Sequence, residues 1–360
     1  MAASTTPTRI ATTRLTHGRL PRWAVPAAAV LATALSIVII QVVSGGVSVG
    51  GVAVLAFVLF LVITEIATRV VEGARQASDR RATNLITGAF VLALVPLVSV
   101  SWEVVRNGVS RLDPQFFSYS MRNVIDVGGG AVHAIYGTLW ATGWATVISV
   151  PIGLLTAIYL SEYGNRGRLS RAITFFVDVM TGIPSIVAGL FAAALMALVA
   201  GQRSATFGFA GSVALSVLMI PIVVRSCEEL LRLVPNELRE ASYALGVPKW
   251  KTIVRIVIPT AISGLVSGII LAIARVIGET APLMIAAGFT QSLNNNPFAD
   301  PMMSLPVFVF DQYTKGYGST DPQAFFDRAW TGALTLILIV MLLNLIGRLI
   351  AARFAPRAGR

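Results

Sequence analysis

Two pairs of oppositely charged residues lie within long apolar stretches of this chain. Arg275 precedes Glu279 by four residues, and Arg225 precedes Glu228 by three. The members of each pair share one face if the stretches are helical. A charge at the middle of a bilayer costs about 2.5–3.5 kcal/mol on insertion scales, so it needs a partner or a polar path. Because the forked donors of arginine match the oxygens of an oxyanion, the pairs indicate a pathway for an anion.

Each pair also has a purely structural explanation. Arg275 and Glu279 could form a static ion pair that joins two helices. Arg225 could lie at the membrane interface, with Glu228 solvated or bound to another subunit. Both explanations stay open at this point.

A third acidic residue precedes a helix break. Asp178 lies in an apolar stretch and could line the same path, but a bond within the helix bundle or near its end is favoured. Gly182 and Pro184 follow it and interrupt helical hydrogen bonding, which allows a hinge or a fixed kink. Thr280 could donate to an anion, although bonding to its own helix backbone is the default for such a hydroxyl.

The elements that position these residues are membrane-spanning helices. Of the 360 residues, 55% are hydrophobic and 12% are charged, which is too apolar for a soluble domain. A span needs about 20 apolar residues. Eight stretches qualify, at roughly 23–43, 48–68, 84–105, 137–161, 173–200, 209–231, 254–283 and 329–352. The predicted fold is therefore an all-α membrane protein.

The distribution of Lys and Arg predicts the orientation. With a cytoplasmic N-terminus, 21 of the 28 fall on the inner side, six fall outside, and Arg275 remains within a span. This asymmetry follows the positive-inside rule and places both termini in the cytoplasm. The same asymmetry accounts for the net charge of +11 without a nucleic-acid partner. The basic cytoplasmic flanks would contact the anionic lipids of the inner leaflet. The outward segments 106–136 and 288–328 could receive a delivery partner or act as lids.

Several kinds of site are excluded by residue content. Cys227 is the single cysteine, and His17 and His133 are the two histidines, so neither a disulfide framework nor a Cys-based metal cluster is expected. The chain has no HExxH motif and no Walker A loop. We therefore predict no catalytic residue, no metal and no cofactor in this chain. If transport here needs ATP, another chain must hydrolyse it.

A short helix is predicted at about 235–247, between the sixth and seventh spans. Asn236 can cap it, with Glu237 near its positive end. Gly246 can end it, and Pro248 prevents its continuation. A second amphipathic piece leads from Lys249 back to the membrane.

The spacing within this segment is specific. Glu240 and Ala241, then Gly246, Ile256 and Pro259, reproduce the pattern E-A-x(4)-G-x(9)-I-x-x-P. This pattern resembles the EAA loop of binding-protein-dependent ABC importer permeases. The resemblance implies a coupling helix that docks on an ATPase subunit.

Four residues would make this coupling contact, namely Glu240, Ala241, Ser242 and Gly246. Glu240 would offer a carboxylate to a basic residue of the partner. Ala241 and Ser242 would allow close approach, and Gly246 would permit the turn. The usual third residue of the motif is alanine, so Ser242 is a mild departure.

The flanking residues are similar to the A-type permease subunits of phosphate-specific (Pst) import systems over roughly 85–355. The matching stretches are PIVVR at 221–225, LAIARVIGETAPLM at 271–284, GIPSIVAGLF at 182–191 and GGGAVHAIYGTL at 128–139. The resemblance implies a six-helix type I importer permease core at 83–360. The segment 1–82, with two further spans, would be an extension whose role the resemblance does not imply.

The resemblance also implies a function and partners. The chain would be the permease subunit of an ATP-driven importer of inorganic phosphate in the bacterial cytoplasmic membrane, working by alternating access. Its pathway residues would be Arg225, Glu228, Arg275, Glu279 and Thr280. Its partners would be a C-type permease subunit, two ATPase subunits that hold ATP and Mg, and an external phosphate-binding protein.

Two alternatives remain open from the residues. The first is import of another oxyanion, molybdate or sulfate, because the arginines would serve these anions almost as well. The second is a regulatory subunit that senses phosphate supply through cytoplasmic docking surfaces alone.

Overall fold

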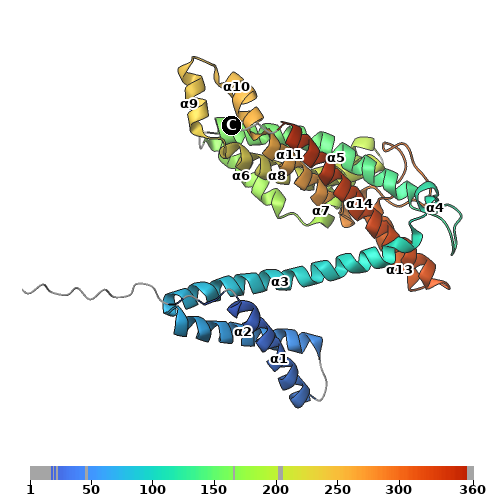
Figure 1. Cartoon of the computed structure of the whole chain (residues 1–360). Helices are drawn as coiled ribbons and strands as arrows, with labels where there is room; N and C mark the ends of the chain where they lie inside the picture. The colour runs from blue at the N-terminus through green and yellow to red at the C-terminus, as the bar shows by residue number, and fades with distance from the viewer. Residues whose placement is uncertain are drawn as a thin grey trace, which may run out of the picture. The chain divides into compact units, whose positions relative to one another are not determined.

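The computed structural model describes residues 18, 20–21, 23–44, 48–164, 167–201 and 206–354, and every regular element in these ranges is helical. The chain divides into two compact units, Met1–Ser101 and Trp102–Arg360 (Figure 1). This division and the expected boundary after residue 82 both fall inside one helix, α3 (Ala74–Gly108). Of the lysines, arginines and histidines counted in the sequence, these lie outside the described ranges: Arg9, Arg14, Arg19, Arg22, Arg166, Arg203, Arg357, Arg360 and His17.

Seven of the eight predicted spans correspond to single helical segments long and apolar enough to cross a membrane. These segments are Ala24–Val43, Gly50–Val71, Ala74–Arg111, Val132–Tyr163, Gly208–Arg232, Lys249–Val276 and Pro322–Arg353. The prediction of an all-α membrane protein is confirmed.

The eighth predicted span, over 173–200, is present as a pair of helices that pass the same test only together, with a bend at the predicted break. The chain forms α6 (Arg168–Thr181) and α7 (Ser185–Ala200), which are bent by 109° at the short break between them. Gly182 ends α6, and Pro184 immediately precedes α7. Proline has no backbone N–H and disfavours the helical conformation of the residue before it, so Pro184 together with Gly182 favours a break between α6 and α7.

The first unit contains α1 (Ala24–Ser44), α2 (Val49–Val71) and most of α3. Polar contacts join α2 and the turn after it to α3. The Asn84 amide donates to Thr64 Oγ1 over 3.1 Å, and Arg80 pairs with the buried Glu72 at 3.1 Å. Buried polar groups need such partners, so these contacts fix how the two helices pack.

The second unit is built on the packing of α5 (Val132–Ile158) against α8 (Gly208–Arg232). Small residues allow this close contact: a Cβ on Gly153 would lie 2.6 Å from the Val223 side chain. Ala145 and Ser149 are fully buried on α5, and Ser149 Oγ donates to Ser216 O over 3.4 Å. Such small-residue contacts are typical of helix pairs in membranes.

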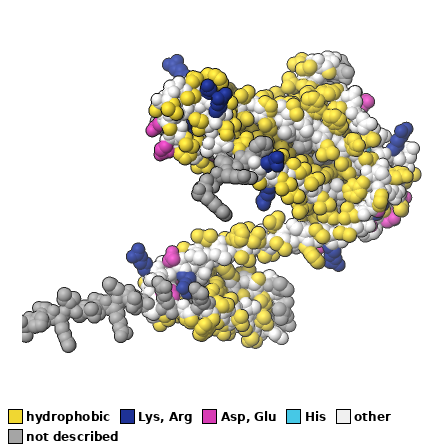
Figure 2. All heavy atoms as spheres, turned by 45° about the horizontal axis from the view of Figure 1, so that its top comes forward, with side chains coloured by type: hydrophobic (Ala, Val, Ile, Leu, Met, Phe, Trp, Pro, Cys, Tyr) yellow, Lys and Arg dark blue, Asp and Glu magenta, His cyan; other side chains and the backbone are white. Residues whose placement is uncertain are grey.

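Other helices surround this pair. α7, α11 (Ile258–Val276) and α12 (Ala281–Ala286) pack against α8, and α14 (Pro322–Phe354) packs against α11. α11 follows the π-helical turn η3 (Ile253–Val257). α5 itself continues as a π-helical turn, η2 (Tyr159–Tyr163). Hydrophobic side chains cover most of the visible face of this unit in Figure 2, as expected for surfaces that meet lipid or other subunits.

The second unit has two distinct ends (Figure 1). One end carries α9 (Asn236–Ala244) and α10 (Lys249–Thr252), and the other carries η1 (Val109–Arg111), α4 (Pro114–Ser118) and α13 (Leu305–Gly316). At the second end the fully buried Arg328 donates to Gln312 Oε1 and Asp126 O, both over 2.7 Å. Asp113 caps α4 by accepting from Phe116 N, and this bond holds the pKa of its carboxyl below the usual range.

Candidate functional site

A cluster of charged side chains lies in the last turns of α8, near the α9 end of the unit. The predicted pair of Arg225 and Glu228 is present, with Arg225 Nη1 and Glu228 Oε2 3.1 Å apart. Glu228 also pairs with Arg232 at 2.6 Å. The Glu228 side chain is 6% exposed, whereas that of Arg225 is 32% exposed. The solvated alternative for Glu228 therefore does not hold in this structure.

Asp178 joins this cluster from α6. Its carboxylate pairs with Arg225 Nη2, so Arg225 is shared between two carboxylates on two helices. The favoured bond within the bundle is therefore present. Asp178, Glu228 and Arg232 also line an open cavity of about 700 Å³ with Ser170 and Arg171.

The predicted pair of Arg275 and Glu279 does not form. α11 ends at Val276, and the chain turns through Ile277 to Thr280 before α12 begins at Ala281. The expected helix over 254–283 is thus interrupted, and the two side chains do not share a helical face. The proline at the second position of α12 is compatible with a helix start there, because its missing N–H would have no helical partner in the first turn.

Arg275 is exposed, and among the described residues its side chain has no ion pair or hydrogen bond. Glu279 and Thr280 are partly exposed and equally lack side-chain partners within the described chain. An arginine so placed in an apolar helix requires water, an anion or another subunit around it. The static pair considered for Arg275 and Glu279 is therefore absent from the part of the chain that the structure describes.

The predicted short helix is present as α9, at residues 236–244. Glu240 and Ala241 are exposed on it. Gly246 follows with φ of +74°, its N–H donates to Tyr243 O, and the N–H of Val247 donates to Ser242 O. This pair of bonds is the Schellman motif, in which glycine accepts the left-handed conformation without steric cost. The predicted helix end at Gly246 is confirmed.

Two side chains of this segment behave differently from expectation. Ser242 is 3% exposed, and its hydroxyl bonds to the hydroxyl of Thr252 at 2.8 Å, so it joins α9 to α10 instead of adding to the exposed surface. Asn236 makes no capping bond to the backbone of α9. Its Oδ1 accepts from Arg239 at 3.2 Å.

Arg239 is a polar residue that sequence reasoning missed. It lies on α9 and pairs with Glu162 on η2 at 2.7 Å. The two residues are 77 positions apart in the chain, so no local spacing could have identified the contact. Cys227 and His133 are buried, and neither belongs to any group of metal-ligating side chains among the described residues.

These features define a class of protein. Spanning helices carry an arginine cluster shared between two helices and a further unpaired arginine, and a short helix with the E-A-x(4)-G pattern is exposed at one end. This combination is typical of a multi-pass permease subunit. The family of binding-protein-dependent transport system inner membrane components matches residues 149–360. The chain belongs to this family.

Individual relatives extend the comparison. The "phosphate transport system permease protein PstA 1" of Mycobacterium tuberculosis H37Rv is 49% identical over 77% of this chain and 88% of its own length. The "phosphate transport system permease protein PstA" of Yersinia pestis is 36% identical over 78% of this chain and 92% of its own. Among solved structures, an inward-facing MetNI methionine ABC transporter gives a TM-score of 0.48 at 21% identity, over 63% of this chain and 95% of that chain.

Membership of the family settles several expectations. The chain is a multi-pass inner-membrane permease subunit and not an enzyme, and it works with a separate ATPase and a binding protein. It needs no cofactor of its own, because ATP is used by the ATPase.

Proposed function

We propose that this chain is a permease subunit for inorganic phosphate and that the anion passes along Arg275 and Arg225. The observation that carries the proposal is the environment of Arg275, which is exposed in an apolar helix and has no described carboxylate beside it. Relatives named as phosphate permeases are 36–49% identical over most of the chain. Arginine binds a phosphate oxyanion through parallel N–H donors.

The two arginines would act at different depths. Arg275 lies 16 residues after Pro259, which is about 24 Å along a helix, so it belongs deep in the membrane or toward its outer half. Arg225 lies on a different helix, near the C-terminal end of α8 and close to the turn that leads to α9. Glu279 and Thr280 follow Arg275 in the segment between α11 and α12. Thr280 could donate a hydrogen bond to the anion. Glu279 could offset the positive charge of Arg275 after the anion has left.

The assembly that this function requires extends beyond the chain. A C-type permease subunit would supply the other half of the pathway. Two ATPase subunits would dock on α9 and its counterpart, and a phosphate-binding protein would dock on the outward loops. Both chain termini would lie in the cytoplasm. ATP-driven approach of the ATPase subunits would open the pathway outward, and hydrolysis would reset it.

The test is labelled-phosphate uptake into proteoliposomes that hold this chain with its ATPase, second permease and binding protein. Uptake that resists excess sulfate and molybdate, and that falls at least tenfold in Arg275→Gln, would support the proposal, since loss of one ionic anion contact is worth roughly 1.5–3 kcal/mol. Competition by sulfate or molybdate would point to another oxyanion. Unchanged uptake by Arg275→Gln would overturn the pathway assignment. If no anion is transported while loss of the chain in cells changes gene expression, the regulatory alternative holds.

A second variant tests the coupling assignment. Glu240→Lys reverses the exposed charge on α9 and is expected to reduce co-purification of the ATPase and to stop uptake. Membrane insertion should be unchanged because Glu240 has no partner among the described residues. Normal uptake by this variant would contradict the docking role of Glu240.

A further inference from the structure

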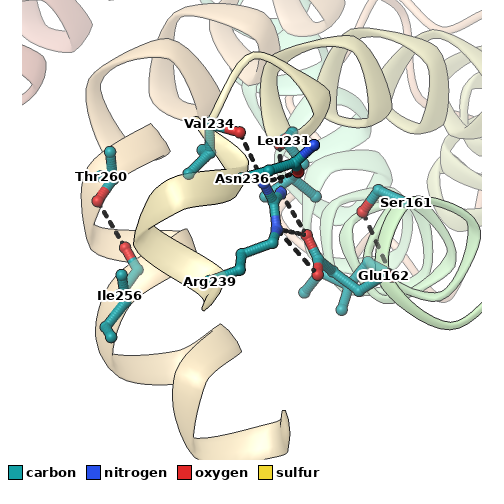
Figure 3. Close-up of polar contacts among 9 residues, drawn as sticks. Ser161, Glu162, Leu231, Val234, Asn236, Arg239, Ile256 and Thr260 are labelled. Atoms are coloured by element: carbon teal, nitrogen blue, oxygen red, sulfur yellow. Dashed lines mark hydrogen bonds and ion pairs between the residues drawn. The ribbon is translucent and has the colours of Figure 1, made fainter. Parts of the chain in front are cut away.

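The α9 helix is attached to the rest of the second unit mainly through one side chain. Arg239 extends from α9 to the carboxylate of Glu162, at 2.7 Å from Nη2 and 3.2 Å from Nε (Figure 3). The same guanidinium donates to Val234 O over 2.6 Å and to Leu231 O over 3.0 Å. Leu231 lies in the last turn of α8, and Val234 lies two residues after its end. Arg239 therefore joins α9 to η2, the end of α5, and to the end of α8.

This contact is enclosed by the protein. The Glu162 side chain is 4% exposed and that of Arg239 is 13% exposed. Exposed ion pairs contribute little and exchange readily with water, whereas removal of one partner from a buried pair leaves an uncompensated charge. The contact is therefore a fixed joint and not a fluctuating surface pair. By contrast, the Arg232 side chain in the neighbouring cluster is 66% exposed.

A second joint lies three residues further along the same face of α9. Ser242 bonds to Thr252, which is fully buried at the end of α10, and α10 leads through η3 into α11. The two joints use one face of α9. The opposite face presents Glu240 and Ala241 to the exterior. α9 thus has an anchored face and a free face.

We propose that Arg239 and Glu162 form the positioning pair through which α9 moves α5 and α8. The proposal rests on the proposed docking of an ATPase on the free face of α9. Because α5 packs along α8, which carries Arg225, a displacement of α9 held by this joint reaches the charged cluster as a rigid-body motion. Without the joint, α9 follows the ATPase while α5 and α8 stay in place. Arg239 and Glu162 contact neither the transported anion nor ATP.

The test uses the assembled transporter in proteoliposomes and measures phosphate uptake and ATP hydrolysis together. The variants are Arg239→Lys, which keeps the charge but loses the fork, and Glu162→Gln, which keeps the shape but loses the charge. We expect the ATPase to co-purify and to hydrolyse ATP, with the phosphate transported per ATP reduced about five- to tenfold, in the range of known coupling energies. Arg69→Lys is the matched control, because Arg69 also pairs with a glutamate but its side chain is 60% exposed.

Two outcomes would overturn the proposal. The first is an unchanged ratio of phosphate to ATP in both variants. The second is a parallel loss of ATPase co-purification, hydrolysis and uptake, which would indicate that the pair only supports folding.

A second measurement tests the joint between Arg239 and Glu162 whichever anion is transported. In the wild-type complex, ATP binding should change the hydrogen exchange of α9 and of residues 159–163 together. In Arg239→Lys the change should persist in α9 and vanish in 159–163. A change in 159–163 that survives in the variant would overturn the joint even if phosphate is not the substrate. Absence of phosphate uptake by the wild-type complex would overturn the proposed function alone.

Discussion

Arg225 and Arg275 carry the same charge in opposite environments. Arg225 is shared between Asp178 and Glu228, while Arg275 has no side-chain partner in the described chain. Asp178 is more exposed than Glu228, at 58% against 6% of the side chain. A carboxylate that already occupies an arginine competes with any anion that approaches it, and the exposed one is more easily displaced. Asp178 is therefore the residue whose removal should most change anion binding at Arg225.

The first prediction concerns Asp178→Asn. The change removes one of the two carboxylates at Arg225, so an anion should be held more strongly there. In proteoliposomes loaded with internal phosphate, half-inhibition of uptake should need about two- to fivefold less internal phosphate, since an exposed pair is worth up to about 1 kcal/mol. Asp178→Glu, which keeps the charge, is the control. Identical inhibition of wild type and Asp178→Asn would show that Asp178 does not compete with the anion.

At the scale of elements, the turn after α9 depends on one backbone conformation. Gly246 has φ of +74°, and open space surrounds the position where a Cβ would lie. The requirement for glycine is thus conformational and not steric. The two hydrogen bonds made by the N–H groups of Gly246 and Val247 close the end of α9 and set the direction of the chain toward α10.

The second prediction is that Gly246→Ala loosens this turn. A residue with a Cβ in the left-handed conformation costs about 1–2 kcal/mol, which corresponds to a five- to thirtyfold change in an opening equilibrium. The Val247 amide should exchange faster with solvent deuterium by about that factor. Gly246→Asn should change it much less, because asparagine tolerates this conformation. Equal exchange in the alanine variant would mean that the turn relaxes to another geometry without cost.

At the scale of the whole molecule, the first unit has its own contacts. The large hydrophobic core cluster of the second unit contains no residue before Phe116. α1 and α2 together cross the membrane an even number of times, so their joint removal leaves the expected sidedness of α3 unchanged. These observations support the proposal that the N-terminal segment is an extension to a permease core.

The third prediction is that deletion of residues 2–72 leaves membrane insertion and phosphate uptake close to those of the full chain. Deletion of residues 2–47 removes α1 but keeps α2, so the number of spans becomes odd. With the N-terminus still in the cytoplasm, the loops rich in Lys and Arg would then lie outside, against the positive-inside rule. That shorter deletion should reduce the amount of chain in the membrane. A stable 2–72 deletion that lacks uptake would assign the first unit a part in transport.

The fourth prediction concerns orientation. Cys227 is fully buried, so it should not react with the reagent, and labelling will report only on cysteines that are introduced. A membrane-impermeant maleimide should label Asn295→Cys in intact cells and Arg255→Cys only after permeabilisation, because both native residues are exposed but belong to opposite sides of the predicted topology. The reverse pattern would invert the assigned topology.

The sequence by itself determined the membrane class, the positions of the apolar stretches that can span a membrane, the short helix with its glycine end, and the pairing of Arg225 with Glu228. These features depend on local composition, on helical spacing or on backbone conformation. Residues close together in the sequence determine all three. It also indicated a break at Gly182 and Pro184, although the 109° bend there depends on how α6 and α7 pack.

Only the tertiary structure decided the other contacts. Asp178 reaches Arg225 across 47 residues and Arg239 reaches Glu162 across 77. Ser242 turns inward to Thr252, and Arg275 is left without Glu279 because α11 ends between them. Each of these outcomes depends on which helices are neighbours and where each one ends. That arrangement is set by packing between small residues on helices that are far apart in the sequence. The apolar stretches have similar compositions, so their local sequences do not show which of them will pack together.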